Sequence, residues 1–299
     1  MGGRQPEVGV LGAHRALSRK RPAVRLAAAV VAAVLLAGCT GDTGDTNGPS
    51  DPDRTATGSA APTPAPTARA VPAPKVGSCH RLTYAQAVAP TAPEGSVPCA
   101  QPHTSITYAA GALDDVVRGH LVAVDSARVQ EQVARTCPRE LQGFLGGTPD
   151  DLRLSMLRPI WFTPTVEQSD EGARWYRCDV IEVTAGKRLV PLGRDLRGAL
   201  GRTDDRERYA MCGTAAPDAA SFRRVPCAEP HTWRAISVVD LPDGAYPGTD
   251  AVRDAGQAPC EDAGRDVAAD PLSFTWGYEW PTREQWAAGQ TYGRCWAPD

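Results

Sequence analysis

The chain contains an eight-residue stretch that occurs twice, as VPCAQPHT at residues 97–104 and as VPCAEPHT at residues 225–232. A second pair follows in the same order, because PTVEQSDEGARWYRC at residues 164–178 aligns without a gap with PTREQWAAGQTYGRC at residues 281–295. Two matches in the same order indicate an internal duplication. A repeated unit of about a hundred residues is too long for a solenoid repeat, so we predict two tandem globular modules.

The domain boundaries follow from the ends of the repeated stretches and from the change in composition before them. A chain of 299 residues accommodates about one to three domains of ordinary size. We predict a signal peptide at residues 1–38, a lipidated N-terminus and disordered linker at 39–75, a first module at 76–185, a connector at 186–208 and a second module at 209–299.

The N-terminal residues have the pattern of a bacterial export signal. Basic residues from Arg15 to Arg25 precede an apolar run at residues 26–37. This run is too short for a membrane-spanning helix, which needs about 20 apolar residues. It leads into LAGC, which resembles the lipobox of bacterial lipoproteins and makes Cys39 the predicted lipidated N-terminus. We therefore expect a lipid anchor at the extracytoplasmic face of the cell membrane; the alternative is an ordinary signal peptide with a coincidental cysteine.

The composition of the linker and the charge of the chain narrow the possible partners. Residues 40–75 consist largely of Thr, Pro, Ala, Gly, Asp and Ser, which cannot form a core, so we expect a disordered spacer between membrane and modules. The formal net charge is -3. The export signal is itself basic, so the rest of the chain is more acidic than this total indicates. A mildly acidic exterior argues against nucleic acid as a partner.

Eight of the nine cysteines follow Cys39, four in each module, and an even number in an exported chain indicates disulfides. Four cysteines allow three pairings, and duplication favours the same pairing in both modules. We choose first with second and third with fourth, because the loops closed in this way have similar lengths in the two copies. The predicted disulfides are Cys79–Cys99, Cys137–Cys178, Cys212–Cys227 and Cys260–Cys295.

Each module is predicted to be an α+β unit with a small antiparallel sheet and one longer helix. Residues 125–145 predict an amphipathic helix with a kink or restart at Pro138, because proline removes a helical hydrogen bond. Residues 249–269 predict the second helix, with a break beside Pro259. Residues rich in β-branched and aromatic side chains predict further strands, including those at 153–161 and 273–280.

The histidines of the repeated stretch, His103 and His231, are candidate binding residues. They could form a paired site or, with Cys99 and Cys227, a Cys-x-x-x-His half-site for a metal ion. A metal site requires free thiolates, whereas exported cysteines are more often oxidised, so we predict no metal and no cofactor. The favoured interpretation is structural: each ring hydrogen-bonds the turn and starts the following strand.

Aromatic side chains alternate from Phe274 to Trp280 and therefore share one face of a predicted strand. Such a stripe can stack on cell-wall sugars, but alternation is also what a half-buried strand requires, so we favour a core position. Trp276, Trp280 and Trp286 are nevertheless candidate binding residues. We expect Trp286 and Trp296 to be partly exposed.

Several features together resemble a known family: the Cys-x-x-Pro-His-Thr stretch, the helix cysteine, the Trp-rich strand, Pro-Thr-x-Glu-Gln and the closing Arg-Cys. They resemble the septum formation domain family of actinobacterial membrane proteins and lipoproteins, in two copies over residues 76–299. The first module departs from the second in having Ser169 where the second has Trp286. The resemblance implies an extracytoplasmic, membrane-associated protein linked by its family name to cell division, and it implies no established chemistry.

The search for catalytic motifs is negative, since the chain has no Gly-x-Ser-x-Gly, His-Glu-x-x-His or glycine-rich phosphate loop. We therefore predict no enzymatic activity, and a surface lipoprotein that binds an unknown envelope protein or cell-wall polymer. Two alternatives stay open. One is an envelope enzyme acting on the cell wall with His103 or His231 as acid or base, and the other is a structural or thiol-sensing extracellular domain.

Overall fold

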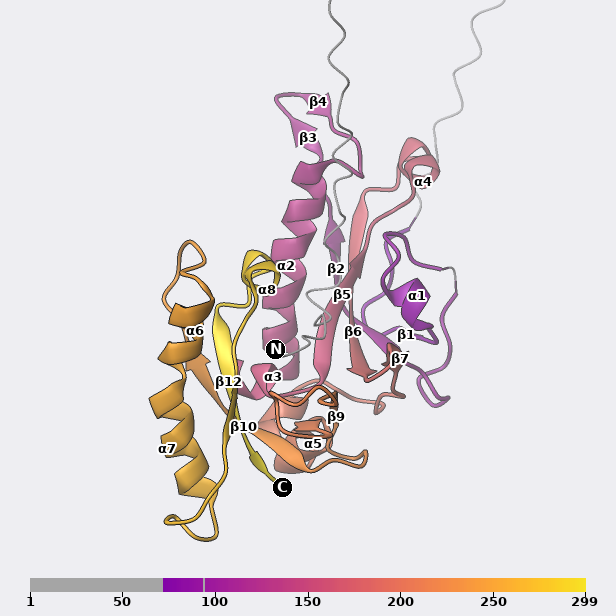
Figure 1. Cartoon of the computed structure of the whole chain (residues 1–299). Helices are drawn as coiled ribbons and strands as arrows, with labels where there is room; N and C mark the ends of the chain where they lie inside the picture. The colour runs from indigo at the N-terminus through magenta and orange to yellow at the C-terminus, as the bar shows by residue number, and fades with distance from the viewer. Residues whose placement is uncertain (1–71, 94) are drawn as a thin grey trace, which may run out of the picture. The chain divides into compact units, whose positions relative to one another are not determined.

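The computed structural model describes residues 72–93 and 95–299 (Figure 1). The predicted signal peptide, Cys39 and most of the predicted linker therefore lie outside the described residues. Helices and antiparallel sheets are mixed along the described chain, which is the α+β class predicted from the sequence. None of the helices in this part of the chain is both long and apolar enough to cross a membrane.

The first half of the structure, residues 76–185, contains most of the first sheet. Its strands are β1 (Cys79–His80), β2 (Ser105–Ala112), β5 (Leu157–Phe162) and β6 (Trp175–Thr184), joined by the short β7 (Arg188–Leu189). The order is β1-β2-β6-β5, with β7 on β6, and every pair is antiparallel. The long helix α2 (Ala127–Leu145) packs against β2, β5 and β6 (Figure 1).

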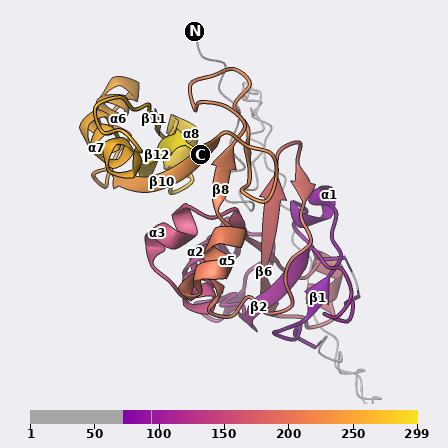
Figure 2. The same cartoon turned by 90° about the horizontal axis from the view of Figure 1, so that it is seen from below.

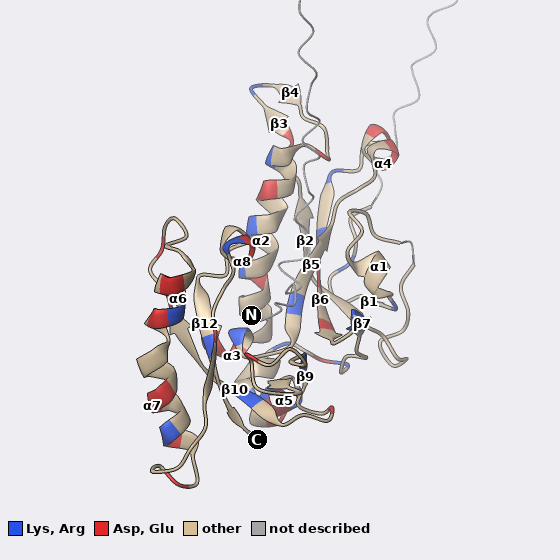
Figure 3. Cartoon of the chain, viewed as in Figure 1, with Lys and Arg blue, Asp and Glu red and all other residues tan. Residues whose placement is uncertain are grey.

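The second half, residues 209–299, contains the second sheet. Its strands are β8 (Met211–Gly213), β9 (Arg224–Pro226), β10 (Trp233–Asp240), β11 (Gly277–Glu279) and β12 (Tyr292–Pro298). The order is β11-β12-β10-β8-β9. Two consecutive helices, α6 (Thr249–Ala255) and α7 (Gln257–Val267), take the place of α2, and α7 packs on β10 and β12 (Figure 2). Short charged pairs such as Arg265 with Glu261 lie along the exposed side of α7 (Figure 3).

The remaining elements are short: α1 (Tyr84–Ala87), β3 (Val116–Val117), β4 (His120–Leu121), α3 (Pro149–Arg153), α4 (Val166–Asp170), the 3-10 helix η1 (Ala199–Gly201), α5 (Thr203–Arg208) and α8 (Arg283–Ala287). The connector contains β7, η1 and α5. Elements α4 and α8 precede the last strand of their halves.

The two halves repeat one another in topology. In chain order β1, β2, α2, β5, α4 and β6 correspond to β8, β10, α6 with α7, β11, α8 and β12, and corresponding strands have the same order in both sheets. An irregularity in the strand pairing is repeated as well, between Thr107 and Ala109 in β2 and between Ala235 and Ser237 in β10. These positions coincide when the repeated stretches are aligned, so the similarity of the two halves extends to a bulge.

The second repeated stretch begins a helix in both halves. The hydroxyl of Thr165 accepts a hydrogen bond from the backbone of Gln168, whose side chain returns to the backbone N–H of Thr165. Thr282 and Gln285 form the same capping box at the start of α8. In both halves Pro-Thr-x-Glu-Gln therefore supplies hydrogen-bond partners for N–H groups at a helix start that would otherwise be unsatisfied.

The structure contains the four disulfides that the order of the cysteines predicts, with Cα–Cα distances between 4.9 and 5.4 Å. Cys137–Cys178 and Cys260–Cys295 join the long helix of each half to the central strand that follows it, and all four of these residues are fully buried. In each half the other disulfide fastens the repeated VPCAxPHT turn to the first strand.

The predicted interruptions of the helices differ from the structure. Helix α2 runs without a break through Pro138, because its buried stripe of Val129, Val133, Cys137 and Leu141 packs on the sheet on both sides of the proline. The second helix does break, but at Gly256 rather than beside Pro259. This places Pro259 in the first turn of α7, where no backbone N–H is needed.

The predicted strands at 153–161 and 273–280 are too long. In the first half residues 149–153 form α3, because Thr148 caps the backbone N–H of Asp151 and a proline occupies the first helical position, so the strand begins only at Leu157. In the second half only Gly277–Glu279 is strand, because β11 pairs with β12 at these three positions alone.

The two halves are joined by backbone pairing and by a shared core, and the described residues fall in one compact unit. The N–H of Met156 donates to the carbonyl of Tyr209 and the N–H of Met211 donates to the carbonyl of Leu154, both at 2.8 Å. The side chain of Met156 packs with Met211 and Trp296 in the core of the second half. The segment between α3 and β5 thus belongs to the second half in packing although it precedes the connector in sequence.

Candidate functional site

The repeated histidines occupy the same turn in both halves. His103 donates from Nδ1 to the carbonyl of Gln101 at 2.8 Å, and His231 donates from Nδ1 to the carbonyl of Glu229 at 2.7 Å. A carbonyl oxygen only accepts, so Nδ1 carries a proton in both rings. The backbone N–H of Gln101 and of Glu229 closes the turn on the carbonyl of the proline three residues earlier. These are the turn contacts that the structural interpretation predicts.

The ring of His103 faces the protein interior. The residue is 2% exposed, and its Nε2 has no hydrogen-bond partner among the described residues. Its backbone carbonyl accepts the N–H of Leu192 from the connector at 2.9 Å. His103 is therefore enclosed between the turn and the connector, and its ring has no route to an external substrate.

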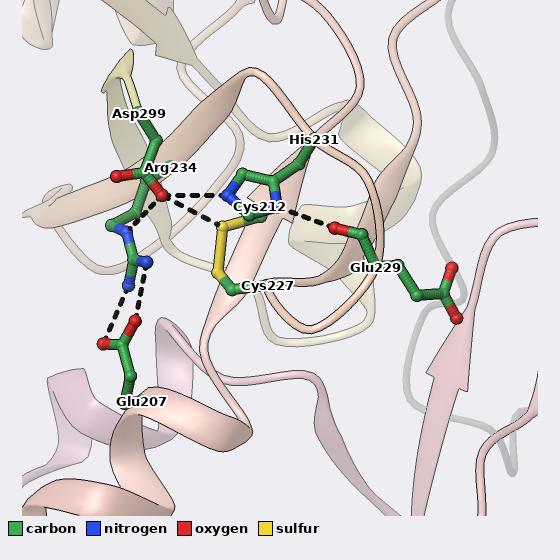
Figure 4. Close-up of a disulfide and its surroundings, with 7 residues drawn as sticks. All are labelled: Glu207, Cys212, Cys227, Glu229, His231, Arg234 and Asp299. Atoms are coloured by element: carbon green, nitrogen blue, oxygen red, sulfur yellow. Dashed lines mark hydrogen bonds and ion pairs between the residues drawn. A yellow bond between two sulfur atoms is a disulfide. The ribbon is translucent and has the colours of Figure 1, made fainter.

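His231 has a polar environment instead (Figure 4). Its Nε2 lies 2.9 Å from Oδ2 of Asp299, and the same oxygen accepts from Nε of Arg234 at 2.8 Å. Both ring nitrogens of His231 face oxygen atoms, so a ring that carries protons on both nitrogens has an acceptor for each of them. Burial acts to raise the pKa of Asp299, but hydrogen bonds from Arg234 and His231 outweigh it and lower that pKa.

The same polar group extends into the connector and the first half. Arg234 forms a bidentate ion pair with Glu207 of α5, at 3.0 and 2.7 Å. The side chain of Glu229 accepts from Oγ1 of Thr184 at 2.9 Å and from Arg188 at 2.7 Å. We call His231, Asp299, Arg234 and Glu207 the His231 cluster; it lies against the Cys212–Cys227 disulfide (Figure 4).

Glu182 is the residue of the first half at the position of Asp299, because Cys178 and Cys295 align and each acidic residue lies four positions later. Glu182 is 2% exposed. Burial raises the pKa of Glu182 to about 7, with Glu229 acting in the same direction and Arg208 opposing. The pKa values of the two corresponding carboxyl groups are therefore shifted in opposite directions. Hydrogen bonds lower the pKa of Asp299, whereas burial raises the pKa of Glu182 to about 7.

A buried polar cluster that was not predicted lies on the face of the first sheet opposite helix α2. The carboxylate of Asp179 accepts from Ser105 at 2.6 Å, from Thr107 at 2.8 Å and from Arg177 at 2.9 and 2.7 Å. His80 contacts the Thr107 hydroxyl at 3.2 Å, and burial, with a smaller effect of Arg177, lowers the pKa of His80. All five residues are buried, so this cluster is closed to ligands and stabilises the sheet.

A signal for this cluster was present in the sequence, in the alternating polar residues Ser105 and Thr107 of a predicted strand and in the Arg177-Cys-Asp179 pattern. No signal marked Asp299, whose role depends on the strand pairing that brings β12 next to β10.

A possible metal-ligand group is present in the second half. A sulfur of Cys212, a ring nitrogen of His231 and a carboxylate oxygen of Asp299 lie within 4.8 Å of one another. The sulfur of Cys212 is bonded to Cys227, however, so it is no thiolate and the donor set does not fit a metal ion in this oxidation state. The chemistry of the group is that of a disulfide beside a charged His–Asp pair.

The aromatic candidates are packed to different degrees. Trp276 and Trp280 are half-buried beside the Cys260–Cys295 disulfide, which is close to the core position that we favoured. The expected partial exposure of Trp286 and Trp296 is wrong. Trp286 is 7% exposed and donates from its ring N–H to the carbonyl of Gly244, and Trp296 is fully buried because it fills the joint with the first half.

A cavity of about 170 Å³ lies at the joint between the halves. The first half contributes apolar side chains, including Leu141 and Leu157, and the second half contributes α8, Tyr292 and Arg294. Arg294 donates from Nε to the carbonyl of Arg153 and so fastens the two walls together. None of the predicted candidate residues lines this cavity.

The fold and its four disulfides define a class of protein: a disulfide-stabilised α+β protein of an oxidising, extracytoplasmic compartment. The chain belongs to the septum formation family, whose model matches residues 76–295 as a single match across both halves. No curated protein and no solved structure matches the chain.

Proposed function

We propose that the protein is a lipid-anchored, non-catalytic binding protein of the cell envelope, built from two tandem copies of a septum formation module, and that it holds an envelope partner in cell division. The family, the disulfides and the repeated topology support the extracytoplasmic tandem. The predicted lipidation of Cys39 supplies the anchor.

The observation that supports a binding role is a difference between two corresponding segments. The segment of the first half contacts the second half, whereas the corresponding segment of the second half is exposed. In the first half the segment before β5 pairs with residues 209–211 and buries Met156. The strand pairings Trp161 with Cys178 and Tyr278 with Cys295 place Leu272 at the position of Ser155, inside this joining segment. Leu272 is 97% exposed.

The chemistry of the open surface fits a protein partner. Val267 is 57% exposed at the end of α7, and the half-buried rings of Phe274 and Trp276 follow Leu272 along the chain. Exposed apolar side chains that occur together mark interaction sites more often than isolated ones do. Leu272 lies one position before Ser273, the counterpart of Met156, and we infer that a partner covers Leu272 with apolar side chains. Stacking of wall sugars on Trp276 is the alternative use of the same surface.

The state of the histidines supports a non-catalytic role. His103 is enclosed, and both nitrogens of His231 are engaged by Glu229 and Asp299. All eight cysteines in the described part of the chain are in disulfides, so a thiol sensor would need a reduced form. Replacement of both histidines by Ala tests the enzyme alternative: a loss of wall-degrading activity in the purified double variant would contradict the proposal.

The binding surface is tested by cross-linking the protein in intact envelopes and identifying what is recovered with it. Leu272→Asp should lower partner recovery at least roughly tenfold, because a desolvated charge in an apolar contact costs more than 1.4 kcal/mol. Leu121→Asp is the matched control, since Leu121 is 65% exposed on the first half. Equal recovery with both variants, or loss only with Leu121→Asp, would argue against this surface.

The anchor and the link to division need separate measurements. Mass spectrometry of the mature protein should find a diacylglyceryl group on Cys39, and Cys39→Ser should release the protein from the membrane fraction. Deletion of the gene should alter septum placement or shape. Normal septa after deletion would remove the division role and leave envelope binding to be judged by the cross-linking.

A further inference from the structure

We propose that Cys212–Cys227 is a site of thiol–disulfide exchange with an external dithiol, and that His231 delivers a proton to the leaving sulfur of Cys212. This goes beyond the proposed binding function, because it assigns a chemical reaction to one of the four disulfides. The reaction is stoichiometric: each molecule exchanges this disulfide once and needs an oxidant before it can do so again.

Burial divides the four disulfides into two that are buried at both residues and two that have one half-buried residue. An exchange step requires an incoming thiolate to reach one sulfur in line with the bond. Cys137–Cys178 and Cys260–Cys295 are fully buried at both residues. In Cys212–Cys227 the first residue is fully buried, whereas Cys227 is half-buried at the surface turn. Cys227 is therefore the more exposed residue of this disulfide, so in the proposed step an external thiolate attacks its sulfur and the sulfur of Cys212 leaves.

The leaving sulfur lies beside a proton donor. Cys212 Sγ is 3.9 Å from Oδ2 of Asp299, and it lies within 4.8 Å of a ring nitrogen of His231. A carboxylate at that distance opposes a negative sulfur, whereas the imidazolium that Asp299 holds in place favours it and can neutralise it by giving up its Nε2 proton. Arg234 keeps the carboxylate in position from the other side (Figure 4).

The step balances in atoms and electrons. A thiolate of the dithiol attacks Cys227 Sγ and forms a mixed disulfide, and Cys212 Sγ departs with the electron pair of the broken bond. The proton on Nε2 of His231 moves to Cys212, leaving a neutral ring whose Nδ1–H still donates to Glu229. The second thiol of the dithiol then attacks the dithiol sulfur of the mixed disulfide, and Cys227 Sγ leaves with the electron pair and takes up the proton that this thiol loses. The protein gains two thiols, and the dithiol is oxidised to a cyclic disulfide.

The chain contains its own control, because Cys79–Cys99 occupies the same place in the first half. Cys79 is 1% exposed and Cys99 is half-buried, so access to the two bonds is similar. His103, however, is buried with no acceptor for a proton on Nε2 among the described residues. A doubly protonated ring there would leave one buried N–H unsatisfied, so we expect no proton donor beside Cys79–Cys99.

The test measures both bonds in one molecule. The oxidised full chain is treated with dithiothreitol under native conditions, quenched with isotope-coded alkylating reagents and analysed by peptide mass spectrometry. Cys212–Cys227 should open roughly tenfold faster than Cys79–Cys99, because a proton delivered to the departing sulfur makes it a better leaving group. Because both bonds react with the same dithiothreitol in the same sample, its thiolate fraction affects both rates equally and does not change their ratio.

Variants and pH separate proton delivery from exposure. His231→Gln and Asp299→Asn should bring the ratio towards one, and His103→Gln should leave it unchanged. In the unaltered protein the ratio should fall as pH rises, because delivery to the leaving sulfur requires a proton on Nε2 of His231, and in His231→Gln it should be flat. Circular dichroism and thermal unfolding identify any variant that has not folded, and the pH profile of the unaltered protein needs no variant at all. A ratio near one, a faster Cys79–Cys99, or a ratio independent of pH and of His231 would overturn the proposal.

Discussion

Strand β6 of the first half presents Arg177 and Asp179 to one face of its sheet, whereas β12 of the second half presents Arg294 and Trp296 at the corresponding positions. In the first half the buried carboxylate is satisfied by hydroxyl groups from β2 and by the guanidinium. In the second half the same face is filled by Trp296, packed edge-on against Phe222 with ring centroids 5.1 Å apart. One backbone thus accepts either a polar network or an apolar core.

The difference shows which half depends on the other. The polar cluster around Asp179 takes all its partners from within the first half. The core around Trp296 includes Met156, which belongs to the first half in sequence, and Arg294 donates to the carbonyl of Arg153. We infer that the second half needs the joining segment for a complete core, because an exposed Trp296 face would be a large apolar patch.

The largest expected effect comes from breaking the polar network. Asp179→Asn keeps the shape but leaves the buried guanidinium of Arg177 without its counter-charge, so the free energy of unfolding should fall by about 3–5 kcal/mol. Urea denaturation measures the change.

Asp114→Asn serves as the control, because Asp114 pairs with Arg128 on the surface and a pair of this kind contributes about 0–1 kcal/mol. If Asp179→Asn lowered the free energy of unfolding no more than the control does, the first half would not depend on the polar network. The contrast with Trp296 would then be a difference in residue type without a difference in stability.

The second effect contrasts Glu182 with its counterpart Asp299. Because the pKa of Glu182 is about 7 in the folded chain and about 4.3 when unfolded, its contribution to stability is largest below pH 4.3, falls as pH rises to about 7 and is then constant. Glu182→Gln should remove this fall and stabilise the protein by up to roughly 3 kcal/mol at pH 8, with little change at pH 4.

Denaturant titrations across this pH range check the prediction. Glu131→Gln, a substitution at an exposed position of α2, should keep the pH dependence of the unaltered chain. If Glu182→Gln retained the fall in stability between pH 4.3 and 7, the buried carboxyl would not be its source.

The smallest effect concerns a feature that the two halves share. Thr165→Ala and Thr282→Ala each remove the capping hydroxyl of a box, so each should lower the free energy of unfolding by about 1 kcal/mol. Thermal unfolding of the two variants makes the comparison direct. Unequal losses would show that the helix before the last strand has acquired different importance in the two halves, most plainly because α8 buries Trp286 where α4 has Ser169.

Much of the fold could be predicted because the duplication supplied two readings of one pattern. The pairing of the cysteines, the α+β class and the helix at 125–145 follow from spacing that occurs twice. The errors arose where packing overrode a local rule. Helix α2 continues through Pro138 because its buried face holds it on the sheet, and the expected exposure of Trp296 failed because the joining segment covers it.

The sequence by itself determined the repeated plan and the four disulfides, because these depend on residues that recur at fixed spacing. Only the tertiary structure decided that His103 is enclosed while His231 is held by Asp299, and that a segment of the first half completes the core of the second. The reason is physical. Burial and charge pairing depend on residues that strand register and packing bring together from distant parts of the chain. The type of a single residue does not show which neighbours it will have.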